Sequence, residues 1–242
     1  MSARVLVVIR KEFREYRRNR FILVTMTGLP VVLLLLLVAE TFALPEGVSA
    51  ETLRRPVGEA LLFLQLIPVM LPTTIAAYAV IGEREQRTLE TVLTTPVTDG
   101  ELLAGKAIAA VLPTVAISWL LFGVYVALAE IFAPQVVLSQ IWTLEQAVAM
   151  VLLAPALAGF AIVIGIIVSL RSSDFRVAQQ VAVLASAPVI AFVALITFRV
   201  LDPSVGLYAA AAAVVFLLNA ACWKLGLRLF SRERLLVSRS TA

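Results

Sequence analysis

The segment TDGELLAGKAIA, residues 98–109, carries residue types at the spacing of a nucleotide-binding phosphate loop. Gly100, Gly105 and Lys106 occupy the glycine and lysine positions of the pattern G-x-x-x-x-G-K-[ST]. In such a loop, backbone amides surround phosphate oxygens, the lysine contacts phosphate and a following hydroxyl reaches Mg²⁺. These residue types therefore raise the question of whether the chain binds ATP.

The surroundings of this segment favour a helix instead. Ala107 stands where the hydroxyl for Mg²⁺ should be, and the residues between the glycines, Glu-Leu-Leu-Ala, are strong helix formers. Thr98 and Glu101 have the spacing of a capping box, which begins a helix before the loop would start. The apolar residues of segment 83–96 also have helical spacing, so no strand leads into the loop. The sequence predicts a helix start here and no ATP site.

The composition indicates a membrane protein. The chain has 242 residues, of which 61% are hydrophobic and 15% charged, and its mean hydropathy is +1.00. In soluble domains about a quarter of the residues are charged. The charges fall between long apolar runs, each long enough for a helix that crosses a bilayer. The predicted fold is an all-α integral membrane protein, a single transmembrane domain over residues 1–242 with spans near 21–42, 60–82, 107–129, 146–170, 177–198 and 203–223.

The distribution of Lys and Arg predicts the orientation of these spans. Seventeen of the 20 lie on the side of the N-terminus, and Arg54, Arg55 and Arg199 lie opposite. The positive-inside rule then makes both termini cytoplasmic in a multi-pass protein of the cell membrane. The basic charge of the chain reflects this topology and implies no nucleic-acid partner.

Residues 3–20, before the first span, are predicted to form an amphipathic helix along the inner membrane surface. Basic side chains there gain from anionic lipid headgroups. The apolar row of this helix is Leu6, Ile9, Phe13 and Tyr16, with Arg10, Arg14 and Arg18 on another face.

Catalytic and metal-binding chemistry is missing from the chain. The sequence has no histidine and one cysteine, Cys222, which removes His-based acid-base catalysis and zinc sites built from His or Cys. Carboxylates are also absent from the middle of the predicted spans, whereas a proton-driven carrier usually buries an ionisable relay there. We therefore expect no catalytic residue, no bound metal or cofactor, and an energy source outside this chain unless the protein is a passive pore.

Polar side chains inside the apolar runs are the candidates for lining a transport pathway. Span two is the strongest, since Pro68 and Pro72 lie on one face near several hydroxyl and amide groups. The candidate pathway residues are Gln65, Thr73, Thr74, Tyr78, Tyr125 and Asn219, with Gln179 as a further polar group.

The segment GEREQRTLETVLTTPVTDGELLAGK, 82–106, reads as a helix, a turn at Pro96 and the capped start of span three. It resembles the loop between spans two and three in permease subunits of ABC transporters of the type-2 exporter family, E-[RK]-E-x-G-T-L-E-x-L-L-x-T-P-[VL]-[ST] followed by L-x-G-K. Arg87 stands where that family commonly has glycine. The span number and the N-terminal helix are similar as well, so the resemblance covers nearly the whole chain.

The resemblance implies a permease subunit that hydrolyses no ATP itself. ATP and Mg²⁺ would be bound by a separate ABC ATPase subunit. In the membrane lipid the permease would work as a homodimer with a second permease copy, or with a similar permease, and with two ATPase subunits. Segment 83–106 would be the cytoplasmic coupling loop. The residues expected to couple to the ATPase are Glu83, Arg84, Glu85, Thr88, Leu89, Glu90, Val92, Leu93 and Pro96.

Other functions stay open at this point. An ATP-independent channel or ion-coupled carrier belongs to another class, and the missing mid-span ionisable groups disfavour the carrier. A membrane enzyme is disfavoured by the absent catalytic residues. Within the resemblance, such permeases also serve systems that mature cofactors or metal centres. The residues do not identify the substrate.

Overall fold

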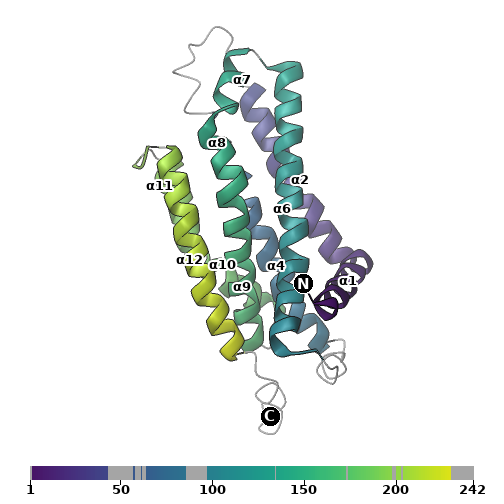
Figure 1. Cartoon of the computed structure of the whole chain (residues 1–242). Coiled ribbons are helices and arrows are strands. Elements are labelled where there is room, and N and C mark those ends of the chain that lie inside the picture. Colours follow the sequence, from purple (N-terminus) through teal and green to yellow (C-terminus); the bar gives the residue numbers. More distant parts are fainter. Residues whose placement is uncertain are drawn as a thin grey trace.

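The computed structural model describes residues 2–42, 57, 61, 64–85, 97–133, 135–172, 174–197, 200–202 and 204–229. Every regular element within these residues is a helix (Figure 1). The elements are α1 (Ala3–Arg18), α2 (Arg20–Phe42), α4 (Ile67–Glu85), α6 (Asp99–Phe132), α7 (Gln135–Ile141), α8 (Leu144–Val148), the π-helix η1 (Ala149–Leu153), α9 (Ala154–Arg171), α10 (Phe175–Ala185), α11 (Ala187–Thr197) and α12 (Val205–Leu229).

Four helical stretches in the described part are long and apolar enough to cross a membrane. They are Arg20–Thr41, Asp99–Phe132, Leu144–Arg171 and Val205–Leu229. These correspond to the first, third, fourth and sixth predicted spans, so the all-helical fold is confirmed, with four helices that could span a membrane. The six-span count stays a prediction, since α4 has a shorter apolar stretch, Ile67–Ala76, and the fifth run is divided.

The fifth apolar run forms two helices of 11 residues each, α10 and α11, that meet at Ser186. The Ser186 amide donates to Ala182 and Val183 carbonyls, and its hydroxyl donates to the Ala182 carbonyl at 3.0 Å. Pro188 follows two residues later and has no N–H to continue the helical ladder. The division of this run is thus explained by proline next to a serine that caps the first half.

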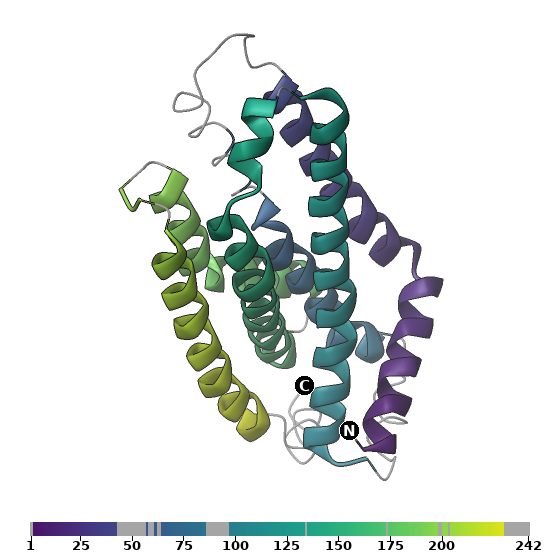
Figure 2. The same cartoon turned by 45° about the horizontal axis from the view of Figure 1, so that its top comes forward.

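Helices α4 and α9 pack closely at the centre of the bundle. A Cβ atom built on Gly165 of α9 would lie 2.6 Å from the Ala76 Cβ of α4, so the two backbones approach where glycine faces alanine. Helix α12 packs on one side of α9 and α6 on another (Figures 1 and 2). Helix α1 lies beside the first turns of α6, and α2 continues from α1 at an angle, toward the other end of α6 (Figure 2).

Helix α6 begins earlier than the third predicted span and ends later. It runs for 34 residues, about 50 Å at 1.5 Å per residue, which exceeds the hydrocarbon thickness of a bilayer. The predicted capping box is confirmed: the Glu101 amide donates to Thr98 Oγ1 at 3.3 Å, and the Thr98 amide donates to Glu101 Oε2 at 3.0 Å. The helix therefore starts outside the apolar run, directly after the expected coupling residues.

Candidate functional site

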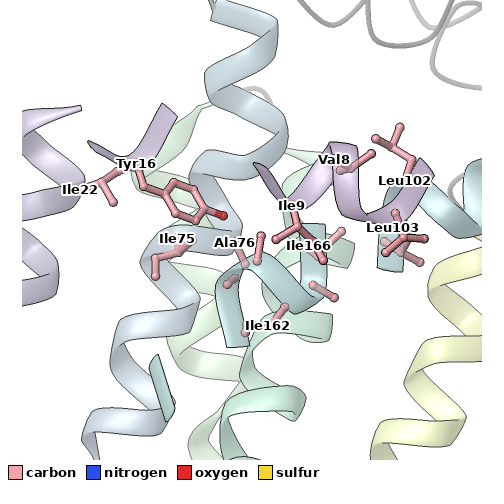
Figure 3. Close-up of a cluster of buried hydrophobic side chains, with 14 of the residues drawn as sticks. Val8, Ile9, Tyr16, Ile22, Ile75, Ala76, Leu102, Leu103, Ile162 and Ile166 are labelled. Carbon is pink, nitrogen blue, oxygen red and sulfur yellow. The ribbon is translucent and has the colours of Figure 1, made fainter. Parts of the chain in front are cut away.

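The glycine and lysine that resembled a phosphate loop form the place where α1 contacts α6. A Cβ atom on Gly105 would lie 2.5 Å from Val8 Cγ1 and 2.6 Å from Val8 Cβ, closer than side chains pack. Glycine at 105 therefore lets α1 approach the backbone of α6. Around this contact, side chains from α1, α2, α4, α6 and α9 form one buried apolar cluster, part of which Figure 3 shows.

Lys106 and Glu12 form an ion pair within this contact. The distance from Lys106 Nζ to Glu12 Oε1 is 2.9 Å, and the two side chains are 1% and 2% exposed. Lys11 Nζ lies 3.3 Å from the same oxygen and 3.0 Å from Glu15 Oε1. A buried charge needs a close partner, because the desolvation of an isolated charge is costly. The ion pair therefore fixes α1 on α6 in one register.

The pKa of Glu12 reports the balance of these effects. Burial raises the pKa of the carboxyl group. The charges of Lys106 and Lys11 and the hydrogen bonds from both ammonium groups together lower it by more, so the pKa of Glu12 lies below the ordinary value. Glu12 is thus ionised at neutral pH.

A second contact joins the beginning of α1 to the beginning of α6. Ser2 caps α1, and its hydroxyl donates to Glu101 Oε1 at 2.8 Å. Arg4 Nη1 lies 3.8 Å from Glu101 Oε2. The backbone N–H of Thr98, followed by the Ser2 hydroxyl, lowers the pKa of Glu101. One carboxylate therefore closes the α6 capping box and binds the end of α1.

These contacts exclude the phosphate-loop interpretation. Residues 100–106 are helical throughout, and the lysine that would bind phosphate is buried against Glu12. Of the predicted apolar row of α1, Ile9 and Tyr16 are buried and Leu6 is 43% exposed, while the buried face also includes Val5, Val8 and Glu12. The signal that sequence reasoning missed is Glu12 itself, an acid three residues after Ile9 and four before Tyr16, on the apolar side of a basic helix.

The expected coupling residues lie directly before this contact along the chain. Glu83, Arg84 and Glu85 belong to the last turn of α4, which continues past the end of the second predicted span. Thr88, Leu89, Glu90, Val92, Leu93 and Pro96 lie outside the described residues. Their role stays a prediction.

The expected pathway residues are distributed over several separate contacts. Gln179 Nε2 donates to Thr74 Oγ1 at 2.9 Å, and Tyr125 OH lies 3.0 Å from Thr41 Oγ1. Thr73 donates to the carbonyl of Met70 in its own helix. The side chain of Tyr78 lies outside the described part. The structure thus joins Thr74 to Gln179, and the role of the set in lining a pathway stays a prediction.

Two of the expected pathway residues, Gln65 and Asn219, have amide atoms without hydrogen-bond partners in the described part of the chain. Gln65 is 1% exposed, and both its Nε2 and its Oε1 are unpaired. Asn219 Nδ2 donates to the Ala156 carbonyl at 2.9 Å, while its Oδ1 is buried and unpaired. Unpaired buried amides are costly, so these groups are candidates for contacts that form with cargo or in another conformation.

The fourth span contains a π-helical turn whose spare carbonyl is bound by another helix. The Ala154 amide donates to the Ala149 carbonyl, five residues back. In that register the Met150 carbonyl would pair with residue 155, but Pro155 has no N–H. Trp119 Nε1 of α6 instead donates to the Met150 carbonyl at 2.9 Å. Trp119 therefore satisfies the group that proline leaves free, and π-turns of this kind are frequent at functional sites.

Comparisons with known proteins agree with this architecture. The family model described as ABC-2 family transporter protein matches residues 6–207, which include the α1–α6 contact and the segment before it. A comparison with curated proteins finds no match. Among the described residues, no group of three or more His, Cys, Asp or Glu side chains could hold a metal ion. Because this family model covers most of the chain, the chain belongs to the ABC-2 family of transporter proteins, and it is a membrane component of such a transporter.

Proposed function

We propose that the chain is the permease subunit of an ATP-driven exporter, with ATP and Mg²⁺ bound by a separate ATPase subunit. The observation that carries this proposal is the α1–α6 contact: Gly105 and Lys106 pack against α1 and follow, along the chain, segment 82–98, the part of the coupling loop on which we expect the ATPase to dock. The residues that resemble a nucleotide site serve the packing of helices instead. The family match supports a permease, and permeases of this family are typically non-catalytic subunits.

A rigid connection at this position suits the transmission of movement from an ATPase. Shifting a two-state equilibrium from 1:99 to 99:1 requires about 5.5 kcal/mol of differential binding. A loosely attached helix start would lose part of this free energy in reordering. Because Glu101 of the capping box accepts a hydrogen bond from Ser2 and Lys106 pairs with Glu12, the start of α6 is joined to α1, and a force on segment 82–98 would move both helices together.

The proposed topology has six spans and cytoplasmic termini. Segment 82–98 and α1 would then lie on the cytoplasmic side, where an ATPase subunit is accessible. Single-cysteine labelling in a Cys222→Ala background tests this arrangement. An impermeant thiol reagent added outside should label cysteine at positions 49 and 204 but not at positions 95 and 238, and the reverse pattern would overturn the topology.

We further propose that two copies of the permease enclose the substrate pathway. Gln65 supports this proposal, since its buried amide has no partner in the described part and could contact cargo when the bundle opens. A mostly apolar bundle suits hydrophobic or amphipathic cargo better than ions. A cargo from the maturation of a cofactor or metal centre is the alternative within the same family.

A nucleotide-binding assay tests whether ATP is bound and hydrolysed by the ATPase subunit and not by this chain. The purified chain should bind no ATP and show no ATPase activity, whereas a complex with its ATPase should hydrolyse ATP. Saturable ATP binding by the purified chain that disappears with Lys106→Ala would contradict the proposal.

A further inference from the structure

An apolar groove of about 570 Å³ lies between α6, α9 and α12. Gly159 and Val163 of α9 line it together with Ala220 and Trp223 of α12. Near one end of these helices α6 and α12 meet, where Gly226 lies against Leu103 and Ile167. The groove is therefore bounded by contacts between helices and is a feature of their packing.

The groove opens toward the outer surface of the bundle. Leu112 and Phe216, which also line it, are 52% and 50% exposed. Asn219 is the polar side chain in the lining; its amide N–H donates to the Ala156 carbonyl, and its Oδ1 has no partner in the described part. In a membrane component an exposed apolar surface is suited to contact with lipid, so the groove fits a hydrocarbon chain that enters from the bilayer.

Two cations follow the groove along one edge of α12. Ala220, Lys224 and Arg228 are spaced four residues apart, which places them in one row on the helix. Lys224 and Arg228 are exposed and form no ion pair with any residue in the described part. The carboxylate of Glu101 at the same end is bound by Ser2 and Arg4. Trp223, next to this row, belongs to a residue type that is enriched where the bilayer meets water.

We infer that the groove binds one acyl chain of an anionic phospholipid, with the phosphate beside Lys224 and Arg228. The acyl chain gains little by leaving other lipid tails, because these are as apolar as the groove. Selection therefore comes from the headgroup, where the two cations should give about a tenfold preference over a zwitterionic lipid.

The charges also argue against a second permease copy as the occupant. A two-fold interface brings the same patch of both copies together. If the groove lay at the centre of that interface, Lys224 and Arg228 would face their own counterparts, and like charges across an interface are unfavourable. The inference rests on membership of a membrane transporter family and not on coupling to an ATPase.

Fluorescence quenching of Trp223 tests the proposed lipid site. The full chain would be reconstituted in phosphatidylcholine vesicles with increasing mole fractions of phosphatidylglycerol brominated on its acyl chains. The chain has three tryptophans, and the difference between wild type and Trp223→Phe isolates the groove signal. We expect saturable quenching, half complete at about a tenfold lower fraction of brominated phosphatidylglycerol than of brominated phosphatidylcholine.

Three variants make the outcome decisive. Ala220→Phe should fill the groove and abolish saturable quenching, while Ala213→Phe, on an exposed position of α12 outside the groove, should leave it unchanged. The double change Lys224→Gln with Arg228→Gln should remove the preference for the anionic lipid. Equal quenching by both lipids in wild type, or equal effects of the two phenylalanine variants, would overturn the inference. Disulfide-linked dimers through cysteine at position 220 in a Cys222→Ala background would also overturn it, because a second copy would then cover the groove.

Discussion

Lys106 Nζ lies 2.9 Å from Glu12 Oε1, and these two residues, 94 positions apart in sequence, join α6 to α1. The lysine belongs to a segment that looks like a phosphate loop, yet its partner is a carboxylate of the same chain. Because both side chains are almost completely buried, the ion pair excludes a phosphate ligand at this lysine. The relationship reassigns the segment from nucleotide binding to the attachment of α1.

Removing one partner of this ion pair should destabilise the bundle more than removing both. Glu12→Gln or Lys106→Met alone leaves a buried group without its partner and should lower the free energy of unfolding by about 3–5 kcal/mol. The double variant Glu12→Met with Lys106→Met should recover most of the loss. Denaturation in mixed micelles measures each value. Lys11→Met is the matched control, expected to cost less than about 1 kcal/mol because Lys11 is partly exposed.

The contribution of Glu12 should depend on pH in a defined direction. Its pKa in the folded chain lies below the ordinary value of 4.5, so the stabilisation is fully present above pH 4.5 and is lost as the pH falls through the folded pKa. The difference in melting temperature between wild type and Glu12→Gln should therefore be constant from neutral pH down to about 4.5 and shrink below it. A difference that shrinks on raising the pH toward 8 would contradict the assignment.

Gly105→Ala should weaken the α1–α6 contact because its Cβ would lie 2.5 Å from Val8 Cγ1. Overpacking of this kind costs about 1–3 kcal/mol. Adding Val8→Ala should rescue little, since the Val8 Cβ itself would be 2.6 Å away, whereas Val8→Gly should rescue more. Gly123→Ala on the same helix is the control: it meets no atom within 4 Å and should be neutral or stabilising. Thermal unfolding in detergent distinguishes these variants.

The helix start at Thr98 was predictable from sequence because a capping box is a local signal, read from residues three apart. For the same reason it was predictable that residues 100–106 form a helix and no phosphate loop. The attachment of α1 was not, because the need for Gly105 appears only when Val8 comes close to it in space. Glu12 on the apolar side of α1 was a readable signal, but its partner could not be named from sequence.

The predicted pathway residues show a second limit. Thr74 and Gln179 were both singled out, but their hydrogen bond joins α4 to α10, and the register between two spans depends on packing. Pro155 lies inside the fourth predicted span. The π-turn around it could not be predicted, because the free Met150 carbonyl is satisfied by Trp119, 31 residues away.

Trp119→Phe should destabilise the fourth span by leaving the Met150 carbonyl unpaired. A buried unsatisfied carbonyl costs about 1–3 kcal/mol. In a Pro155→Ala background the loss should be smaller, because alanine supplies the N–H that proline lacks. A double-mutant cycle on unfolding free energies measures this coupling, and additive effects of the two changes would refute the interpretation. Trp142→Phe, at an exposed tryptophan, is the control.

The assignment of segment 82–98 as the coupling element is tested most directly by the docking of an ATPase subunit on it. The change of Leu89 and Leu93 together to Ala should remove apolar anchors and lower co-purification of the ATPase by at least tenfold, with a parallel loss of permease-stimulated ATP hydrolysis. Changing Leu217 and Leu218 of α12 together to Ala should leave both unchanged, since these leucines lie on an exposed face of the bundle. Equal membrane yields would show that both variants insert. Wild-type co-purification and ATP hydrolysis in the Leu89 and Leu93 variant would contradict the assignment of this segment as the coupling element.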